Sequence, residues 1–147
     1  MTVVMEMSTD NDIKNTKLDQ AWNPIQKRYS WAQVKASNLN LNGGQTIVVI
    51  AHGNGNEIGN ARPGTIDINA QTFLVLIQSN VRAAPAAIYI STCGPGIAEF
   101  AAAVTIAAKQ NQIWSKTKIF GHSDPVSGPV PPPNDIRWVQ IFNEKLK

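Results

Sequence analysis

Residues 87–96, AIYISTCGPG, decide how the rest of the chain is organised. The run begins as a short apolar, β-favouring segment and ends in a thiol, which two glycines and a proline follow. An earlier run, TIVVIAHG at 46–53, ends in the same way on His52 and Gly53. Continuously apolar, β-branched runs of this length are typical of strands buried on both faces, as in a parallel sheet. We therefore predict strands over 46–51 and 87–91.

Helical patterns lie between and after these runs. Asn69 is a suitable cap for a helix reaching Ser79, and its apolar side chains are expected to face the sheet. The alanine-rich stretch 97–109 predicts a second helix, because alanine has the highest helix propensity. Residues 116–120 predict a third strand, and 136–146 a closing helix. Alternating strands and helices indicate an α/β fold with a mainly parallel sheet.

The amino-terminal part of the chain carries weaker signals. Residues 1–20 are polar and show no sustained period, which predicts a flexible segment. The remaining residues, 21–147, are expected to form a single α/β domain, because 147 residues suit one domain. Within it, residues 25–36 fit either a helix or an edge strand.

Composition excludes several classes of protein. A single cysteine forms no intramolecular disulfide and no cysteine-rich metal site. The net charge of +3 is spread along the chain, so the basic stripe typical of nucleic-acid binders is missing. There is neither a long apolar run for a membrane span nor an ordinary signal peptide. We expect a protein of the cytoplasm, or one exported without such a peptide, that binds neither nucleic acid nor membrane.

Three chemically active side chains follow the predicted strands. In parallel sheets ligands bind beyond the carboxyl ends of the strands, and His52, Cys93 and His122 all lie there. A thiol attacks as its thiolate, so it needs a nearby base or a lowered pKa. His52 suits the base, and His122 is a possible alternative. Amides at Gly53 and Cys93 suit an oxyanion hole. Such acyl transfer requires no metal and no cofactor, and we expect none.

The two blocks IVVIAHG and AIYISTCG resemble the clan of caspase-like cysteine peptidases, over roughly residues 45–96. That clan includes caspases, gingipains, legumains, clostripain and the self-cleaving domains of large bacterial toxins. The resemblance implies a three-layer α/β sandwich with two strands before the histidine strand, and with the histidine and cysteine strands as neighbours. It implies Cys93 as nucleophile, His52 as catalytic histidine and the amides of Gly53 and Cys93 as oxyanion hole. It also implies a peptide or protein substrate and a bacterial toxin or effector setting.

Two other functions fit the same residues. A different thiol enzyme, either a toxin-type deamidase or an α/β-hydrolase, would pair Cys93 with His122. An interaction module on the same fold would perform no chemistry, and its cysteine would be buried and inert. Substrate, activator and oligomeric state are not encoded in any motif of this sequence.

Overall fold

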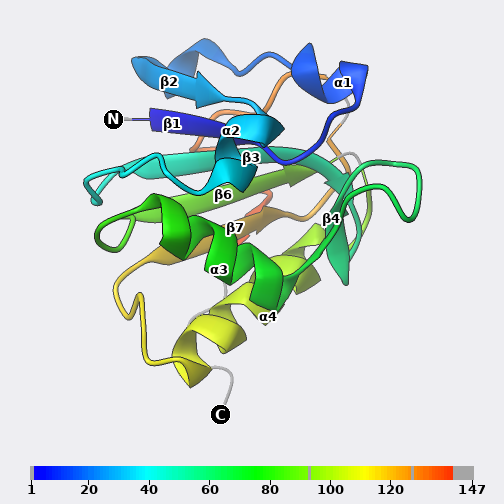
Figure 1. The fold of residues 1–147 in the computed structure, drawn as a ribbon. Coiled ribbons are helices and arrows are strands. Elements are labelled where there is room, and N and C mark those ends of the chain that lie inside the picture. The colour runs from blue at the N-terminus through cyan, green and yellow to red at the C-terminus, as the bar shows by residue number, and fades with distance from the viewer. Residues whose placement is uncertain (1, 93, 127, 141–147) are drawn as a thin grey trace.

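The structure is a computed structural model that describes residues 2–92, 94–126 and 128–140. It contains a mixed, mostly parallel sheet of eight strands with helices packed against it, so the predicted α/β class is confirmed (Figure 1). The order along the main sheet is β2-β1-β3-β6-β7-β8. These strands are β1 (Thr2–Glu6), β2 (Ile25–Tyr29), β3 (Thr46–Gly53), β6 (Ala87–Thr92), β7 (Lys118–His122) and β8 (Trp138–Gln140).

Only β8 runs antiparallel to its neighbour in this main path. Two short strands, β4 (Glu57–Gly59) and β5 (Asp67–Asn69), extend from the end of β3 as an antiparallel pair. The strands predicted over 46–51 and 87–91 are therefore confirmed. The strand predicted over 116–120 begins and ends two residues later, so that His122 is its last residue.

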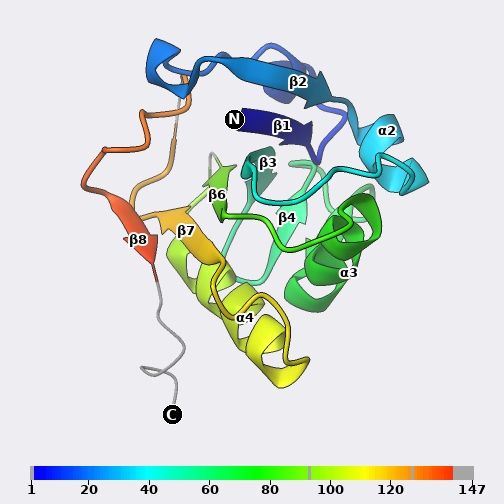
Figure 2. The ribbon, with the colours of Figure 1, turned by 90° about the vertical axis from the view of Figure 1, so that its left-hand side faces the viewer.

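Two helices cover one face of the sheet, α3 (Ala70–Asn80) and α4 (Ile97–Gln110) (Figure 2). Asn69 caps α3 by accepting a hydrogen bond from the Thr72 amide at 2.8 Å, as its sequence predicted. Phe73 of α3 and Phe100 of α4 meet edge to face, with ring centroids 5.7 Å apart. They join the core on this side, together with Val3, Met5, Ile47, Val49, Ile88 and Ile90. No helix in the described part of the chain is long and apolar enough to cross a bilayer.

Short elements and loops cover the opposite face. These are α1 (Asn11–Lys14), the 3-10 helix η1 (Gln20–Trp22) and the proline-rich segment near Val130. Tyr89 lies at the centre of an aromatic cluster, with its ring stacked 4.4 Å from Phe120 and edge-on to Trp22 at 4.9 Å. Burial in this cluster raises the pKa of the Tyr89 phenol. Alternate residues of β1 and β3 point into the two cores, which explains why both strands read as continuously apolar.

The expectation of a flexible segment over residues 1–20 is wrong for its first part. Thr2–Glu6 is a buried strand, paired in parallel with β2 on one side and with β3 on the other. Its register runs from Thr2 beside Thr46 to Glu6 beside Ile50. A run of five residues is too short to show a clear period, and Glu6 gives it a polar end. Tertiary pairing therefore decides its structure.

Residues 25–36, for which helix and edge strand were both open, contain one of each. Ile25–Tyr29 is the edge strand β2, and Trp31–Ala36 is helix α2. Ser30 separates them with a capping box, in which its hydroxyl accepts from the Gln33 amide and its own amide donates to the Gln33 side chain.

The helix predicted over 136–146 is wrong where the structure describes it. Residues 138–140 form β8, and 141–147 lie outside the described residues. Trp138 packs edge-on against Tyr89 at 5.1 Å and donates its indole N–H to the Pro132 carbonyl at 2.9 Å. Trp138, which the helical pattern assigned to a helix face, thus packs in the aromatic cluster around Tyr89.

Arg28 of β2 joins three parts of the amino-terminal region. Its Nε donates to the Glu6 carboxylate at 2.6 Å, and its Nη1 donates to the Thr16 carbonyl at 2.6 Å. Its Nη2 donates to the carbonyls of Ile13 and Lys14 at the end of α1, at 3.0 and 3.3 Å. Glu6 is largely buried, with 10% of its side chain exposed, so the ion pair compensates a carboxylate that has little water around it.

We predict that Arg28→Ala lowers the free energy of unfolding by about 2–4 kcal/mol, because Glu6 keeps a buried charge without its partner and α1 loses its anchor. Urea unfolding followed by circular dichroism measures the change. Arg62→Ala, at an exposed arginine whose side chain has no hydrogen-bond or ion-pair partner among the described residues, is the matched control and should change stability by less than about 0.5 kcal/mol. Equal losses in the two variants would contradict the assigned role of Arg28.

Candidate active site

The candidate site lies where β3 and β6 end side by side. The two strands pair in parallel along their length, and the last pair in register is Ala51 with Thr92. His52 and Gly53 continue β3 beyond this pair. A Cβ placed on Gly94 would overlap the Gly53 carbonyl, so the two segments that follow Ala51 and Thr92 remain in close contact just past the paired residues. Cys93 lies outside the described residues, between Thr92 and Gly94.

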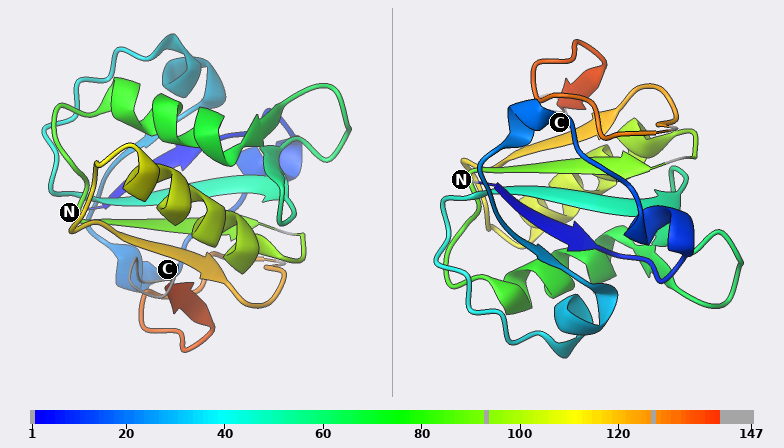
Figure 3. Two further views of the ribbon diagram at one scale, coloured as in Figure 1. Left: turned by 90° about the horizontal axis from the view of Figure 1, so that it is seen from below. Right: turned by 90° about the horizontal axis from the view of Figure 1, so that it is seen from above.

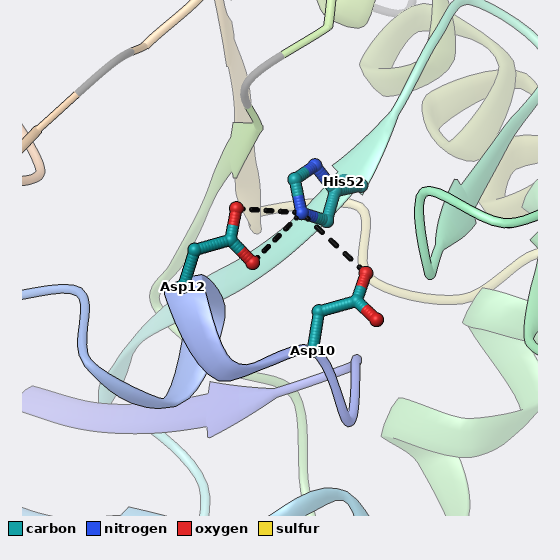
Figure 4. Close-up of side chains that lie close together, drawn as sticks. All are labelled: Asp10, Asp12 and His52. Atoms are coloured by element: carbon teal, nitrogen blue, oxygen red, sulfur yellow. Dashed lines mark hydrogen bonds and ion pairs between the residues drawn. The ribbon is translucent and has the colours of Figure 1, made fainter.

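His52 is held by two carboxylates from the loop after β1. Its Nε2 lies 3.0 and 2.9 Å from the two carboxylate oxygens of Asp12 and 3.5 Å from Oδ2 of Asp10 (Figure 4). The His52 side chain is 17% exposed. Nδ1 lies on the far side of the ring from the carboxylates, and within the described ranges it has no hydrogen-bond partner. The ring therefore presents one nitrogen to acidic groups and leaves the other available.

The two aspartates are fixed by the short helix α1 and by a loop beyond β3. Asp10 is the N-cap of α1, and its carboxylate accepts the Ala61 amide at 2.8 Å. Asn60 strengthens the link, since its Oδ1 accepts from the Ser8 hydroxyl at 2.6 Å and from the Thr9 amide at 2.9 Å. Figure 3 shows α1 at the edge of the sheet toward which the arrowheads of β1, β3 and β6 point.

Sequence reasoning did not single out Asp10 or Asp12. They lie some forty residues before His52, and only the pairing of β1 with β3 brings them beside it. Recognising 2–6 as a strand would have placed both carboxylates at the same carboxyl edge as the histidine.

Asp10, Asp12 and His52 also offer three metal-ligand atoms within 4.8 Å of one another. Imidazole nitrogen and carboxylate oxygen are ligands that zinc accepts in proteins. Both carboxylates lie against the same imidazole nitrogen of His52, and these two contacts account for the closeness of the three groups without an ion. The expectation of a site without metal or cofactor therefore stays a prediction.

His122, the possible alternative base, sits deep in the protein. The residue is 2% exposed, and its ring meets Trp138 edge-on at 5.0 Å. Nδ1 lies 2.9 Å from the Asp124 carbonyl, and Nε2 lies 3.6 Å from an Asp135 carboxylate oxygen. Both nitrogens thus face the segment that follows β7 and precedes β8. This arrangement favours a structural role for His122 over proton transfer to a substrate.

Gly53, one of the two expected oxyanion residues, lies at the same edge as the last residue of β3. Gly53 pairs with Ile58 of β4, and the Asn54 side chain closes the turn by accepting from the amides of Asn56 and Glu57. Helix α4 begins at Ile97, as its sequence predicted, after Gly96 in the left-handed region at φ 77°. The amide of Cys93 lies outside the described residues, so that half of the expected oxyanion hole stays a prediction.

Two cavities open at this edge of the sheet. The larger, of about 540 Å³, is lined by Asp12, Ile50, Ala51, Ser91 and Thr92 together with residues of α1 and of the loop after β7. The smaller, of about 270 Å³, is more polar and is lined by His52, Gly53, Gly94 and the loop from Glu57 to Pro63. The edge of the sheet therefore has room for a ligand next to Asp12 in one cavity and next to His52 in the other.

Comparison of the chain with protein-family models, with curated proteins and with solved structures found no significant match. The resemblance to caspase-like peptidases consequently remains a prediction from the two sequence blocks. The assignment of function depends on the geometry of the strand ends.

We predict that Gly94→Ala destabilises the protein by about 2 kcal/mol or more, because its methyl group overlaps a backbone carbonyl that cannot rotate away. Chemical denaturation measures the loss. Gly55→Ala is the control, since its methyl group would chiefly meet the Glu99 carboxylate, which is the end of a flexible side chain. A Gly94 variant as stable as the Gly55 variant would show that the strand ends are not closely packed.

We predict that Asp135 contributes to stability against acid. The Arg137 guanidinium donates to its carboxylate at 2.7 and 3.0 Å and holds the pKa of that carboxyl well below its usual range. A depressed folded-state pKa stabilises above the unfolded value of about 3.9, and the contribution is lost as pH falls below it. Thermal unfolding from pH 6 to pH 2 should therefore show a steeper acid loss for wild type than for Asp135→Asn. Parallel curves would contradict this.

Proposed function

We propose that this protein is a cysteine-dependent hydrolase of the caspase-like type, which cleaves a peptide or amide bond with Cys93 as nucleophile and His52 as general base. The observation that carries the proposal is the alignment of the two strand ends. Ala51 and Thr92 are partners in register, and Gly53 and Gly94 touch just beyond them. Cys93 follows Thr92 directly, and His52 follows Ala51.

The orientation of the imidazole supports the role of His52. With a proton on Nε2, the ring donates to Asp12, and the lone pair on Nδ1 is free to accept the thiol proton. A carboxylate on the far nitrogen fixes the tautomer and stabilises the imidazolium that forms, as in other triads. Asp12 is thus a positioning residue, with Asp10 as a second, more distant carboxylate.

The proposed reaction follows from these positions. The thiolate attacks the substrate carbonyl, and the thiol proton passes to Nδ1 of His52. The tetrahedral oxyanion is stabilised by amides at Gly53 and Cys93. The His52 imidazolium then protonates the departing amine as the C–N bond breaks, leaving a thioester on Cys93. Water, deprotonated by His52, hydrolyses the thioester and releases the acid.

The arrangement of the sheet also supports the caspase-like assignment. The resemblance implies two strands before the histidine strand, and β1 and β2 precede β3 in the chain. It implies that the histidine and cysteine strands are neighbours, and β3 pairs with β6. Helices α3 and α4 on one face, with α1 and η1 on the other, are compatible with the proposed three-layer sandwich.

The alternative in which Cys93 pairs with His122 has less support. Reaching a substrate would require His122 to leave its contacts with Asp124, Asp135 and Trp138. An interaction module without chemistry would not need a histidine with one nitrogen held by carboxylates and the other without a hydrogen-bond partner among the described residues. We therefore propose His52, and not His122, as the general base.

The test is the rate of Cys93 alkylation by iodoacetamide between pH 5 and pH 10. We expect the thiol to titrate well below its reference value of about 8.5. His52→Ala should restore ordinary titration and slow alkylation at pH 7 by at least about tenfold, since thiolate is then scarce. Asp12→Asn should have a smaller effect in the same direction, because the imidazolium loses its carboxylate.

His122→Gln is the matched control, and circular dichroism verifies that each variant is folded. Loss of the shifted titration in His122→Gln but not in His52→Ala would favour the other thiol enzymes. A slow thiol that titrates identically in all variants would contradict an activated nucleophile. Addition of EDTA should leave the alkylation profile unchanged, whereas a large change would point to a metal held by Asp10, Asp12 and His52.

A further inference from the structure

The larger cavity is lined by the strand residues that immediately precede the two proposed catalytic residues in the chain. Ser91 and Thr92, the two residues that precede Cys93, line it, and so does Ala51, which precedes His52. Its volume of about 540 Å³ exceeds that of any single side chain. It opens on the face of the sheet that α1 and the loop after β7 cover.

We propose that this cavity receives the side chain of the substrate residue that supplies the acyl group, and that it selects a large apolar side chain such as leucine or phenylalanine. The proposal rests on the proposed hydrolase function and adds a substrate class to it. The acyl carbon becomes bonded to Cys93. The side chain of the substrate residue that carries this carbon is therefore expected to lie next to β6, the strand that leads into Cys93. This strand contributes Ser91 and Thr92 to the cavity.

The chemistry of the walls determines the preference. The lining surface of the cavity is mainly apolar, and Ile13, Ile50, Ala51, Val126 and Pro129 contribute to it. Apolar surfaces that lose water on contact favour apolar partners.

Charge does not favour an ionic side chain. The cavity has one acidic residue, Asp12, and one basic residue, Lys17. The Asp12 carboxylate already bonds His52. A substrate aspartate would be attracted by Lys17 but repelled by Asp12, whereas a substrate lysine would be repelled by Lys17 and would compete with His52 for Asp12. Either ion would also lose water against the apolar walls, which is costly without a dedicated partner.

Asp12 lines the cavity and also contacts the proposed catalytic histidine. Its carboxylate bonds His52, while the same residue forms part of the cavity wall. A bound apolar side chain would exclude water from this carboxylate and strengthen its interaction with the imidazolium. The cavity is therefore placed to couple recognition of the substrate to the action of the base.

The test compares four chloromethyl ketones, acetyl-leucyl, acetyl-phenylalanyl, acetyl-aspartyl and acetyl-lysyl. In each reaction the Cys93 thiolate displaces chloride and forms a thioether with the methylene carbon. Each second-order rate is divided by the iodoacetamide rate of the same protein, which removes differences in thiol reactivity. We expect the leucyl and phenylalanyl reagents to react at least about tenfold faster than the other two. Equal rates, or a faster aspartyl or lysyl reagent, would overturn the assignment.

A pair of variants at the two ends of α1 locates the effect. Asn15, which follows the last residue of α1, is exposed and lines the cavity, whereas Asn11, the first residue of the helix, is exposed and does not line it. Asn15→Trp should narrow the cavity and slow the leucyl and phenylalanyl reagents by about fivefold or more after division by the iodoacetamide rate of the same variant. Asn11→Trp should leave all rates unchanged. Equal effects of the two substitutions, or none from Asn15→Trp, would place the preference elsewhere.

Binding without chemistry separates this proposal from the proposed function. In Cys93→Ser, N-acetyl-leucinamide should shift the amide resonances of Ala51 and Thr92, and N-acetyl-aspartamide should not. If alkylation shows an activated thiol and these shifts are missing, the cavity assignment alone fails. If the thiol is inert in every variant, the hydrolase proposal fails and the substrate role of the cavity fails with it.

Discussion

The in-register parallel pairing of β1, β3 and β6 is the constraint on which the site depends. Glu6 lies beside Ile50, and Ala51 lies beside Thr92, so the three strands end at the same edge of the sheet. Parallel strands need long crossover connections, and the chain supplies them as helices and loops that return to the opposite edge. Everything that follows these strands is consequently collected in one place, including Asp10, His52 and Gly94.

The sequence predicted the parts of the fold that carry their own local signal. The two apolar blocks and the helices at Asn69 and Ile97 are continuous, long enough and bounded by recognisable caps or glycines. The first strand was missed because its polar end, Glu6, is explained only by Arg28, 22 residues away. The last strand was missed because the aromatic residues near Trp138 suit a helix face as well as a cluster around Tyr89.

Within the candidate site, too, the residue with a local sequence signal could be predicted, and the residues placed by distant contacts could not. His52 could be predicted because a histidine at the end of a buried strand is placed by local pattern alone. Its carboxylate partners could not, since the contact joins residues 40 positions apart through a strand that was not recognised. His122 looked equivalent to His52 in sequence, and burial separates the two. His122 is 2% exposed and contacts Trp138 and Asp135, whereas His52 has one nitrogen that no other described residue bonds.

The position of Asp12 gives α1 an importance greater than its length suggests. A helix of four residues does not form by itself, because nucleation fixes several residues for few hydrogen bonds. Arg28 holds its carboxyl end through the carbonyls of Ile13 and Lys14, and the loop near Asn60 holds its amino end. The carboxylate that orients His52 therefore depends on contacts with β2 and with the loop after β4. Stability of the amino-terminal region and alignment of the imidazole are consequently linked, because the same short helix serves both.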